Sequence, residues 1–294
     1  MWDQIAEQIS QATGERFQIS DRRSVGGGCI NQGYQISNGK SHYFIKLNQA
    51  CEFAMFEAEV LGIQQIGKTQ TIRVPQPICW GILGNSAYLV LEWLNLGGKS
   101  QASAWKAMGQ KLALLHRWTP PENEPGYENF GWGINNTIGS TPQINTWEIN
   151  WAKFWQEHRI GYQLKLAKRR GGHFEQAEKL LNLIPDLLAG HDPKPSIVHG
   201  DLWGGNAAVT AEGEPVIYDP ATYFGDREVD LAMTELFGGF PPSFYQGYYQ
   251  IFPLESGYEQ RKKLYNLYHI LNHFNLFGGS YAAQANQMIR EILR

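Results

Sequence analysis

The residues with the clearest chemical meaning lie in one loop-like run and in the β-rich run that follows it. Positions 199–206 read H-G-D-L-W-G-G-N, and positions 216–220 read V-I-Y-D-P. The carboxylate of Asp201 suits a base that orients a hydroxyl, whereas the oxygens of Asn206 and Asp219 suit a Mg2+ ion that bridges phosphates. The spacing H-G-D-x-x-x-x-N, followed by a carboxylate at the end of a strand, therefore predicts a phosphoryl-transfer site.

A glycine-rich turn near the N-terminus is a candidate for contact with phosphate. Positions 24–31 read S-V-G-G-G-C-I-N. Because they lack side chains, Gly26, Gly27 and Gly28 let backbone N–H groups approach phosphate oxygens. Three glycines also suit an ordinary hairpin turn, so this turn alone leaves both interpretations open.

The strand and the helix that follow supply the groups that would hold the phosphates. Residues 43–47 form a β-prone run with Lys46 among apolar neighbours, and residues 53–66 have the pattern of a helix. Kinases use a lysine that reaches the phosphates and a helix glutamate that steadies this lysine. We select Glu59 as that glutamate and keep Glu57 as the alternative. Taken singly, these positions would also suit solvated surface charges.

The sequence predicts two lobes joined by a short connection. Two β-prone runs at 78–83 and 87–93 precede a loosening of the pattern at N-L-G-G, which begins at position 95. In a kinase-like arrangement, the backbone of Glu92, Trp93 and Leu94 would bond the adenine edge. We place a nucleotide-binding lobe at 1–94, a linker at 95–100 and a helical catalytic and substrate lobe at 101–294.

Helical spacing of apolar residues dominates the second part of the chain. A long polar segment at 119–146 is expected to form either part of the acceptor site or a structural flap. His116 is expected to be an ordinary helix-end residue. Asp230 is either a helix cap or a group that turns inward to bond the H-G-D run, and we favour the second role. Helices are expected at 2–13, 101–116, 147–170, 174–188, from 228, and at 245–252, 258–277 and 282–293.

Composition limits the class of protein. The 294 residues carry a formal net charge of -3 and are 13% aromatic, which excludes a disordered chain and gives no general attraction to nucleic acid or an anionic membrane. The three cysteines, at positions 29, 51 and 79, have neither the even number of a disulfide framework nor metal-site spacing. No signal-peptide pattern or long apolar run is present. We expect a soluble, cytoplasmic protein without nucleic-acid or membrane partners.

Over nearly its full length, the chain resembles the fructosamine kinases, also called ketosamine kinases. The resemblance rests on H-G-D-L-W at 199–203 with G-N at 205–206, on D-P-A at 219–221, and on D-L-A-M-T at 230–234. This family is grouped with the aminoglycoside and choline phosphotransferases in the protein-kinase-like fold. The resemblance implies an α+β, bilobal fold with a small antiparallel-sheet N-lobe and a larger, mainly helical C-lobe.

The resemblance also implies a reaction and a set of roles. The reaction is the ATP-dependent phosphorylation of the sugar 3-hydroxyl of a ketosamine, carried on a small amine or on a protein lysine, which serves to repair glycated protein. Trp203 would line the sugar-amine pocket, and Asp230 and His199 would orient the loop. Asp201 would be the base, Asn206 and Asp219 the ligands of Mg2+, and Lys46 and Glu59 the residues that manage the phosphates of ATP.

Two questions stay open at the level of sequence. Cys29 is similar to the redox-sensitive cysteine of some family members, whose oxidation links two chains, but a small buried cysteine is the commoner case. A monomer and a homodimer are therefore both expected states. A kinase for an aminoglycoside, choline or an amino-sugar is the alternative function. The intact set of catalytic residues argues against a third hypothesis, a non-catalytic pseudokinase.

Overall fold

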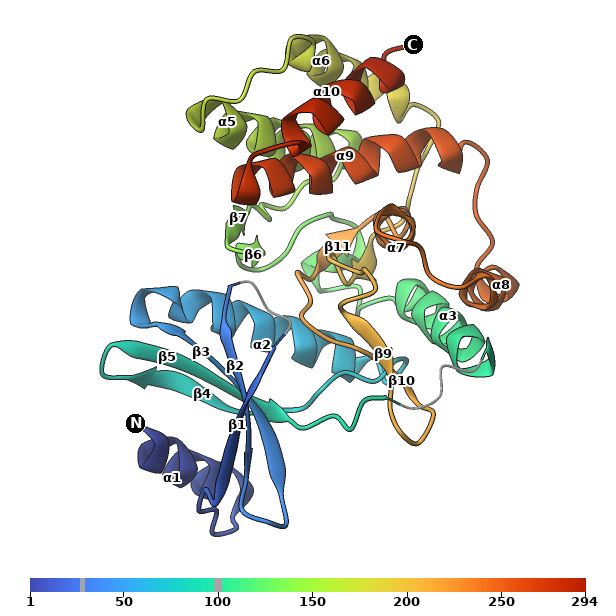
Figure 1. Cartoon of the computed structure of the whole chain (residues 1–294). Coiled ribbons are helices and arrows are strands. Elements are labelled where there is room, and N and C mark those ends of the chain that lie inside the picture. Colours follow the sequence, from blue (N-terminus) through green and yellow to red (C-terminus); the bar gives the residue numbers. More distant parts are fainter. Residues whose placement is uncertain (27–29, 98–101) are drawn as a thin grey trace.

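The N-terminal lobe is built on a five-stranded antiparallel sheet with the strand order β1-β2-β3-β5-β4 (Figure 1). The computed structural model of the chain describes residues 1–26, 30–97 and 102–294. The predictions made for Gly27, Gly28 and Cys29 lie outside these residues. The strands are β1 (Asp21–Val25), β2 (Gln32–Ser37), β3 (His42–Gln49), β4 (Pro77–Leu83) and β5 (Ser86–Glu92).

A helix covers each face of this sheet, with α1 (Trp2–Thr13) on one side and α2 (Phe53–Lys68) on the other (Figure 1). Along β5, Tyr88 and Val90 join the core beneath α1, whereas Leu89 and Leu91 join the core beneath α2. Side chains alternate between the two faces of a strand, so a strand between two helices is apolar at consecutive positions. The buried run A-Y-L-V-L at 87–91 follows from this arrangement.

The second lobe is mainly helical. Its central helix, α9, spans 20 residues and packs against α5, α7 and α10, while α3 and α8 pack against each other. The helix predicted at 258–277 has these bounds in the structure. The helices are α3 (Ala102–Arg117), α4 (Trp151–Phe154), α5 (Tyr162–Arg169), α6 (Ala177–Leu187), α7 (Glu228–Leu236), α8 (Pro242–Ile251), α9 (Tyr258–Phe277) and α10 (Tyr281–Ile292).

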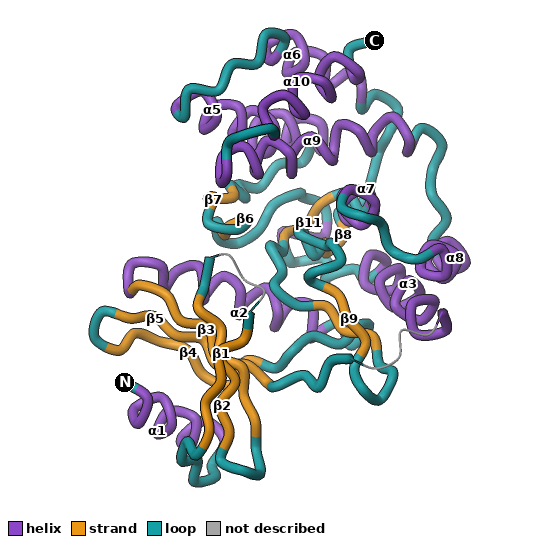
Figure 2. The backbone as a smooth tube through the Cα atoms, viewed as in Figure 1, coloured by secondary structure: helices purple, strands orange, loops and turns teal. Residues whose placement is uncertain are grey.

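In the described part of the second lobe there are three short antiparallel strand pairs, and two of them frame the run 199–206, hereafter the HGD loop (Figure 2). β8 leads into the loop and β9 leaves it. β8 pairs with β11, and β9 pairs with β10, so both ends of the loop are held by backbone hydrogen bonds. The pairs are β8 (Ser196–Val198) with β11 (Tyr223–Gly225), β9 (Ala207–Val209) with β10 (Pro215–Ile217), and β6 (Asn136–Ile138) with β7 (Thr141–Gln143).

The structure corrects two predictions about elements in this lobe. The segment predicted as a polar loop contains the β6–β7 hairpin, which turns at Gly139 with a φ of +63°. The helix predicted from 147 begins only at Trp151, because the side chain of Asn150 accepts a hydrogen bond from the Lys153 N–H and caps the helix there. A π-helical turn at Trp155–Gly161 then interrupts it.

The connection between the lobes runs beside the β9–β10 pair. The predicted linker at 95–100 falls between the end of β5 and the start of α3. Before the undescribed stretch, Leu96 bridges to Thr210, and the Ala211 N–H donates to the Asn95 carbonyl. In the described ranges, none of the helices combines the length and the hydropathy that a membrane crossing would need.

Candidate active site

Lys46 forms ion pairs with one carboxylate from each lobe. It lies in β3 on the face that looks toward α2, since its neighbours Ile45 and Leu47 belong to the core beneath α1. Its Nζ is 2.8 Å from Glu59 Oε1 and 2.5 Å from Asp219 Oδ1. The side chains of Lys46 and Glu59 are only 7% and 10% exposed, so this is a buried ion pair across the N-lobe.

The choice between two helix glutamates is decided by the helix face. Glu59 pairs with Lys46, whereas Glu57 is exposed on another face of α2. Burial alone would lower the pKa of Lys46, but the charges of Asp219 and Glu59 outweigh burial and raise this pKa. Burial raises the pKa of Glu59, with Lys46 acting in the opposite direction. Lys46 therefore stays cationic and can face anionic phosphates.

Asp201 and Asn206 are joined within the HGD loop. Asn206 Nδ2 donates to the backbone oxygen of Asp201 at 2.8 Å and to its carboxylate Oδ2 at 3.1 Å. Burial, together with the nearby charge of Asp219, raises the pKa of Asp201 to about 7, against the effect of the Asn206 hydrogen bond. The carboxylate therefore has the proton affinity of a base that works near neutral pH.

Gly200 allows the HGD loop to lie against the segment that carries Asp219. Its φ is +81°, and a Cβ at this position would lie 2.2 Å from the Ala221 carbonyl oxygen. The Ala221 N–H donates to the His199 carbonyl at 2.8 Å, which ties the two segments together. Asp219 itself has a φ of +57°, an unusual value for a residue other than glycine and one that marks local strain at this site.

His199 stiffens the loop in a defined tautomer. Its Nε2 is 2.9 Å from the Tyr218 carbonyl oxygen, which can only accept, so Nε2 carries the proton. Its Nδ1 then accepts the Asp201 N–H at 3.2 Å. Burial lowers the pKa of His199, which keeps the ring neutral. The side chain thus links the residue before Asp219 to the backbone of Asp201.

Asp230 bonds the backbone of the HGD loop, as the favoured prediction required. Its Oδ2 accepts the His199 N–H at 2.7 Å, and its Oδ1 accepts the Gly200 N–H at 2.8 Å. Burial alone would raise the pKa of Asp230, but the hydrogen bonds that the carboxylate accepts, first of them the one from His116, oppose burial and lower it. The first N–H of α7 is bound instead by Asp226, whose Oδ1 accepts the Glu228 N–H at 3.0 Å.

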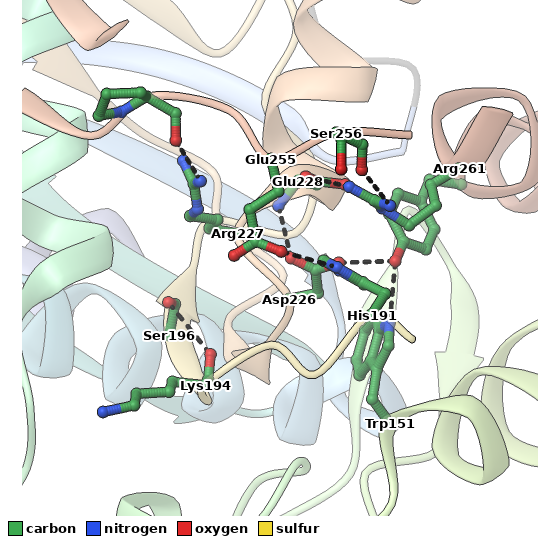
Figure 3. A network of polar contacts seen from close by, with 12 residues as sticks. Trp151, His191, Lys194, Ser196, Asp226, Arg227, Glu228, Glu255, Ser256 and Arg261 are labelled. Atoms are coloured by element: carbon green, nitrogen blue, oxygen red, sulfur yellow. Dashed lines mark hydrogen bonds and ion pairs between the residues drawn. The ribbon is translucent and has the colours of Figure 1, made fainter. Parts of the chain in front are cut away.

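Charged side chains that the sequence analysis did not single out anchor the start of α7 (Figure 3). Asp226 Oδ2 accepts from His191 Nε2 at 2.7 Å and from the Tyr265 hydroxyl at 2.6 Å. Glu228 forms a two-pronged pair with Arg261, at 2.7 and 2.8 Å. The run D-R-E at 226–228 was visible in the sequence, but its burial was not. These contacts fix the helix that carries Asp230.

The buried amides of the β6–β7 hairpin support the structural interpretation of the 119–146 segment. Gln143 Nε2 donates to the Asn136 side chain at 2.8 Å and to the Ala221 carbonyl at 3.0 Å. Asn136 Nδ2 donates to the Thr222 carbonyl at 2.8 Å. The hairpin therefore acts as a flap that holds the segment just after Asp219 in place.

Trp203 is partly exposed, and Glu92, the first of the predicted adenine-binding residues, is held by contacts within the protein. Trp203 is 38% exposed, and its ring lies over Gly205, where a Cβ would be 2.3 Å from the ring. The Glu92 carboxylate is engaged by Arg73 at 2.5 Å, and its backbone N–H donates to the Gln76 carbonyl. The adenine contact of Glu92, Trp93 and Leu94 stays a prediction.

Comparison with known proteins gives one family over the whole chain. The family model of fructosamine kinase matches residues 1–294. A protein named "Probable ketoamine kinase" from Synechocystis sp. is 57% identical over 293 residues, which are 100% of this chain and 97% of the relative. A chloroplastic protein-ribulosamine 3-kinase from Arabidopsis thaliana is 41% identical over 285 residues, which are 96% of this chain and 85% of the relative.

Solved structures agree with this assignment. The crystal structure of a "Putative fructosamine-3-kinase" from Haemophilus somnus has a TM-score of 0.92 and 33% sequence identity, and the match covers 100% of this chain and 98% of that one. A choline kinase from Streptococcus pneumoniae, 15% identical, has a TM-score of 0.63 and shares the fold. The fold is therefore the α+β, bilobal protein-kinase-like fold. This chain belongs to the fructosamine kinase family and is an ATP-dependent phosphotransferase.

Proposed function

We propose that this protein transfers the γ-phosphoryl group of ATP to the sugar 3-hydroxyl of ketosamines, on small amines or on protein lysines, as a step in protein deglycation. The observation that carries the proposal is the convergence of Lys46, Asp219 and the HGD loop, whose Asp201 and Asn206 are hydrogen-bonded to each other. The names of the relatives, ketoamine kinase and protein-ribulosamine 3-kinase, support the substrate class.

Asp201 would act on the acceptor. Its carboxylate is oriented by Asn206 and by the backbone contacts of the HGD loop, and its pKa of about 7 lets it take up the proton of the sugar hydroxyl. Phosphoryl transfer has a loose transition state, so orientation of the hydroxyl matters more than base strength. Lys46 would neutralise charge on the phosphates from the opposite lobe.

The residues around Asp219 fit a magnesium ion. The donor set that the structure offers is made of oxygens, from the Asp219 carboxylate and the Asn206 amide, and Mg2+ prefers oxygen ligands. Since Asn206 Nδ2 donates to Asp201, its Oδ1 is the atom that would face a cation. Bound there, Mg2+ would supply charge neutralisation for the phosphates of ATP.

Trp203 would form one wall of the acceptor site. Its ring is exposed, is braced by the backbone at Gly205 and lies two residues after Asp201. An indole face packs against the apolar face of a sugar ring and attracts the cationic amine of a ketosamine. This combination suits an amino-sugar adduct.

The test is a phosphate-transfer assay with ATP and Mg2+ that compares ribulose-lysine with fructose-lysine as acceptors. Phosphorylation of at least one adduct at the 3-hydroxyl is expected. Asp201→Asn should lower kcat by roughly 10²- to 10⁴-fold, the range of general-base effects, with little change in nucleotide affinity. Failure of the wild-type protein on both adducts would refute the substrate class. Full turnover by the Asp201 variant would refute the assignment of the base.

A further inference from the structure

A second set of buried groups, from α3 and α8, reaches Asp230 in addition to the HGD loop. His116, the next-to-last residue of α3, is 2% exposed, although the sequence suggested an ordinary helix end. Its Nε2 is 3.1 Å from Asp230 Oδ2, and its Nδ1 is 2.8 Å from the Tyr248 hydroxyl on α8. The Asp230 carboxylate, 1% exposed, thus receives a third hydrogen bond besides those from the backbone of the HGD loop.

The direction of each hydrogen bond follows from what each group can donate. Asp230 is ionised and only accepts, so His116 Nε2 carries the proton. Arg227 Nη1 lies 3.3 Å from the Tyr248 hydroxyl and can only donate to it. Tyr248, whose pKa is raised by burial, stays protonated, and its hydroxyl donates a hydrogen bond to His116 Nδ1, the ring nitrogen without a proton. The chain therefore runs in one direction, from Arg227 through Tyr248 and His116 to Asp230.

Close packing of α3 on α8 allows His116 and Tyr248 to form their hydrogen bond. A Cβ on Gly109 would lie 2.0 Å from the Phe244 carbonyl oxygen, and a Cβ on Gly247 would lie 2.0 Å from the Lys106 carbonyl oxygen. Only glycine at both positions allows the two backbones to approach so closely. This close approach brings the end of α3 next to Tyr248.

The end of α3 is also tied to the strand that leads into the HGD loop. Ser196 Oγ, at the start of β8, donates to the backbone carbonyl of His116 at 2.8 Å. The backbone of His116 thus holds the strand before the loop, while its side chain holds the carboxylate that binds the loop. Both contacts act on the same stretch of chain.

We propose that His116 is a positioning residue: by holding Asp230, it fixes the backbone of the HGD loop that carries Asp201. A hydrogen bond to a charged, buried acceptor is among the stronger ones, and its loss leaves the carboxylate held only by the two amides of the loop that it positions. The inference rests on the proposed function in so far as Asp201 orients the acceptor. His116 itself does not touch substrate.

The test compares two variants of one residue. His116→Leu removes the donor and keeps an apolar side chain in the pocket. His116→Gln retains an amide N–H at about the reach of Nε2. His116→Leu is expected to lower kcat by roughly 10- to 100-fold, the effect of one lost hydrogen bond to a charged group, with the KM for ATP nearly unchanged. His116→Gln should recover most of this loss. Leu114→Gln, at an exposed position of the same helix, should match the wild type.

Two further measurements separate positioning from stability and from the choice of substrate. Hydrogen exchange of the 199–206 peptide should be faster in His116→Leu than in His116→Gln, because the loop amides lose their fixed acceptor. Tyr248→Phe removes only the hydroxyl that bonds His116 and should lower kcat less than His116→Leu does. It replaces the leucine variant in the test if that variant does not fold. If the wild type phosphorylates no ketosamine, the proposed function fails, and the exchange measurement still decides this inference.

Three results would overturn the role of His116. The first is a wild-type kcat in His116→Leu. The second is an equal loss of kcat in the leucine and glutamine variants without a difference in loop exchange. The third is a change confined to the melting temperature, since a merely structural residue would alter stability and leave kcat below the melting temperature intact.

Discussion

Replacing Lys46 by methionine should make the free energy of unfolding depend strongly on pH, because the buried carboxylate of Glu59 loses its cationic partner. In the wild type, Glu59 is 10% exposed and lies 2.8 Å from the Lys46 ammonium. Burial and the charge of Asp219 already raise the pKa of Glu59, and Lys46 is the group that opposes them. Without the ammonium, Glu59 must either stay charged in a poorly solvated place or take up a proton.

The size of the effect follows from these two options. Breaking a buried ion pair by removing one partner costs about 3–5 kcal/mol when the remaining charge stays ionised. Protonation avoids this cost, and the folded variant then holds one more proton than the unfolded chain, whose glutamates have a pKa of about 4.3. Stability therefore falls as pH rises, by about 1.4 kcal/mol per pH unit until the raised folded pKa is passed.

Urea unfolding followed by tryptophan fluorescence at pH 6, 7 and 8 measures this slope. Lys46→Met should lose about 3 kcal/mol of unfolding free energy between pH 6 and pH 8 if the folded pKa of Glu59 lies above this range. The matched double variant Lys46→Met/Glu59→Gln has no carboxylate at position 59 and should lose far less. Parallel pH profiles of the two variants would refute the reasoning, since the slope would then not come from Glu59.

Two other predictions concern the HGD loop and the anchor of α7. Gly200→Ala should lower the melting temperature by several degrees, because the φ of Gly200 is +81° and the new Cβ would lie 2.2 Å from the Ala221 carbonyl oxygen. Gly204→Ala is the control and should be tolerated, because the space around its Cβ is open. Equal melting temperatures of the two variants would contradict this prediction. Burial lowers the pKa of His191, but the hydrogen bond and charge of Asp226 outweigh burial and raise it, so the stability from this pair is complete below about pH 6.5 and is lost as pH rises through the folded pKa. His191→Gln should lack this fall above about pH 6.5 in urea unfolding, and an identical fall in both proteins would argue against the pair.

Local patterns predicted most of the elements because their causes are local. The apolar repeat of residues 258–277 gave a helix whose bounds agree with the structure, and the apolar run in residues 87–93 gave β5, an interior strand of the sheet. The spacing within H-G-D-x-x-x-x-N placed Asp201 and Asn206 in one short loop, and the structure joins them there by hydrogen bonds. Hairpin and helix limits at 136–154 were missed, because they depend on a single cap and on buried amides that pack against a distant segment.

The sequence by itself determined which residues can do chemistry and the family to which the chain belongs. Only the tertiary structure decided which groups meet. Asp219 reaches Lys46 across 173 positions of chain, and the helix face, which follows from packing of α2 on the sheet, selects Glu59 over Glu57. His116 meets Tyr248 because two glycines let α3 and α8 touch, and its other ring nitrogen meets Asp230 on α7. Such contacts depend on burial and on distance in space, which no local pattern of residues encodes.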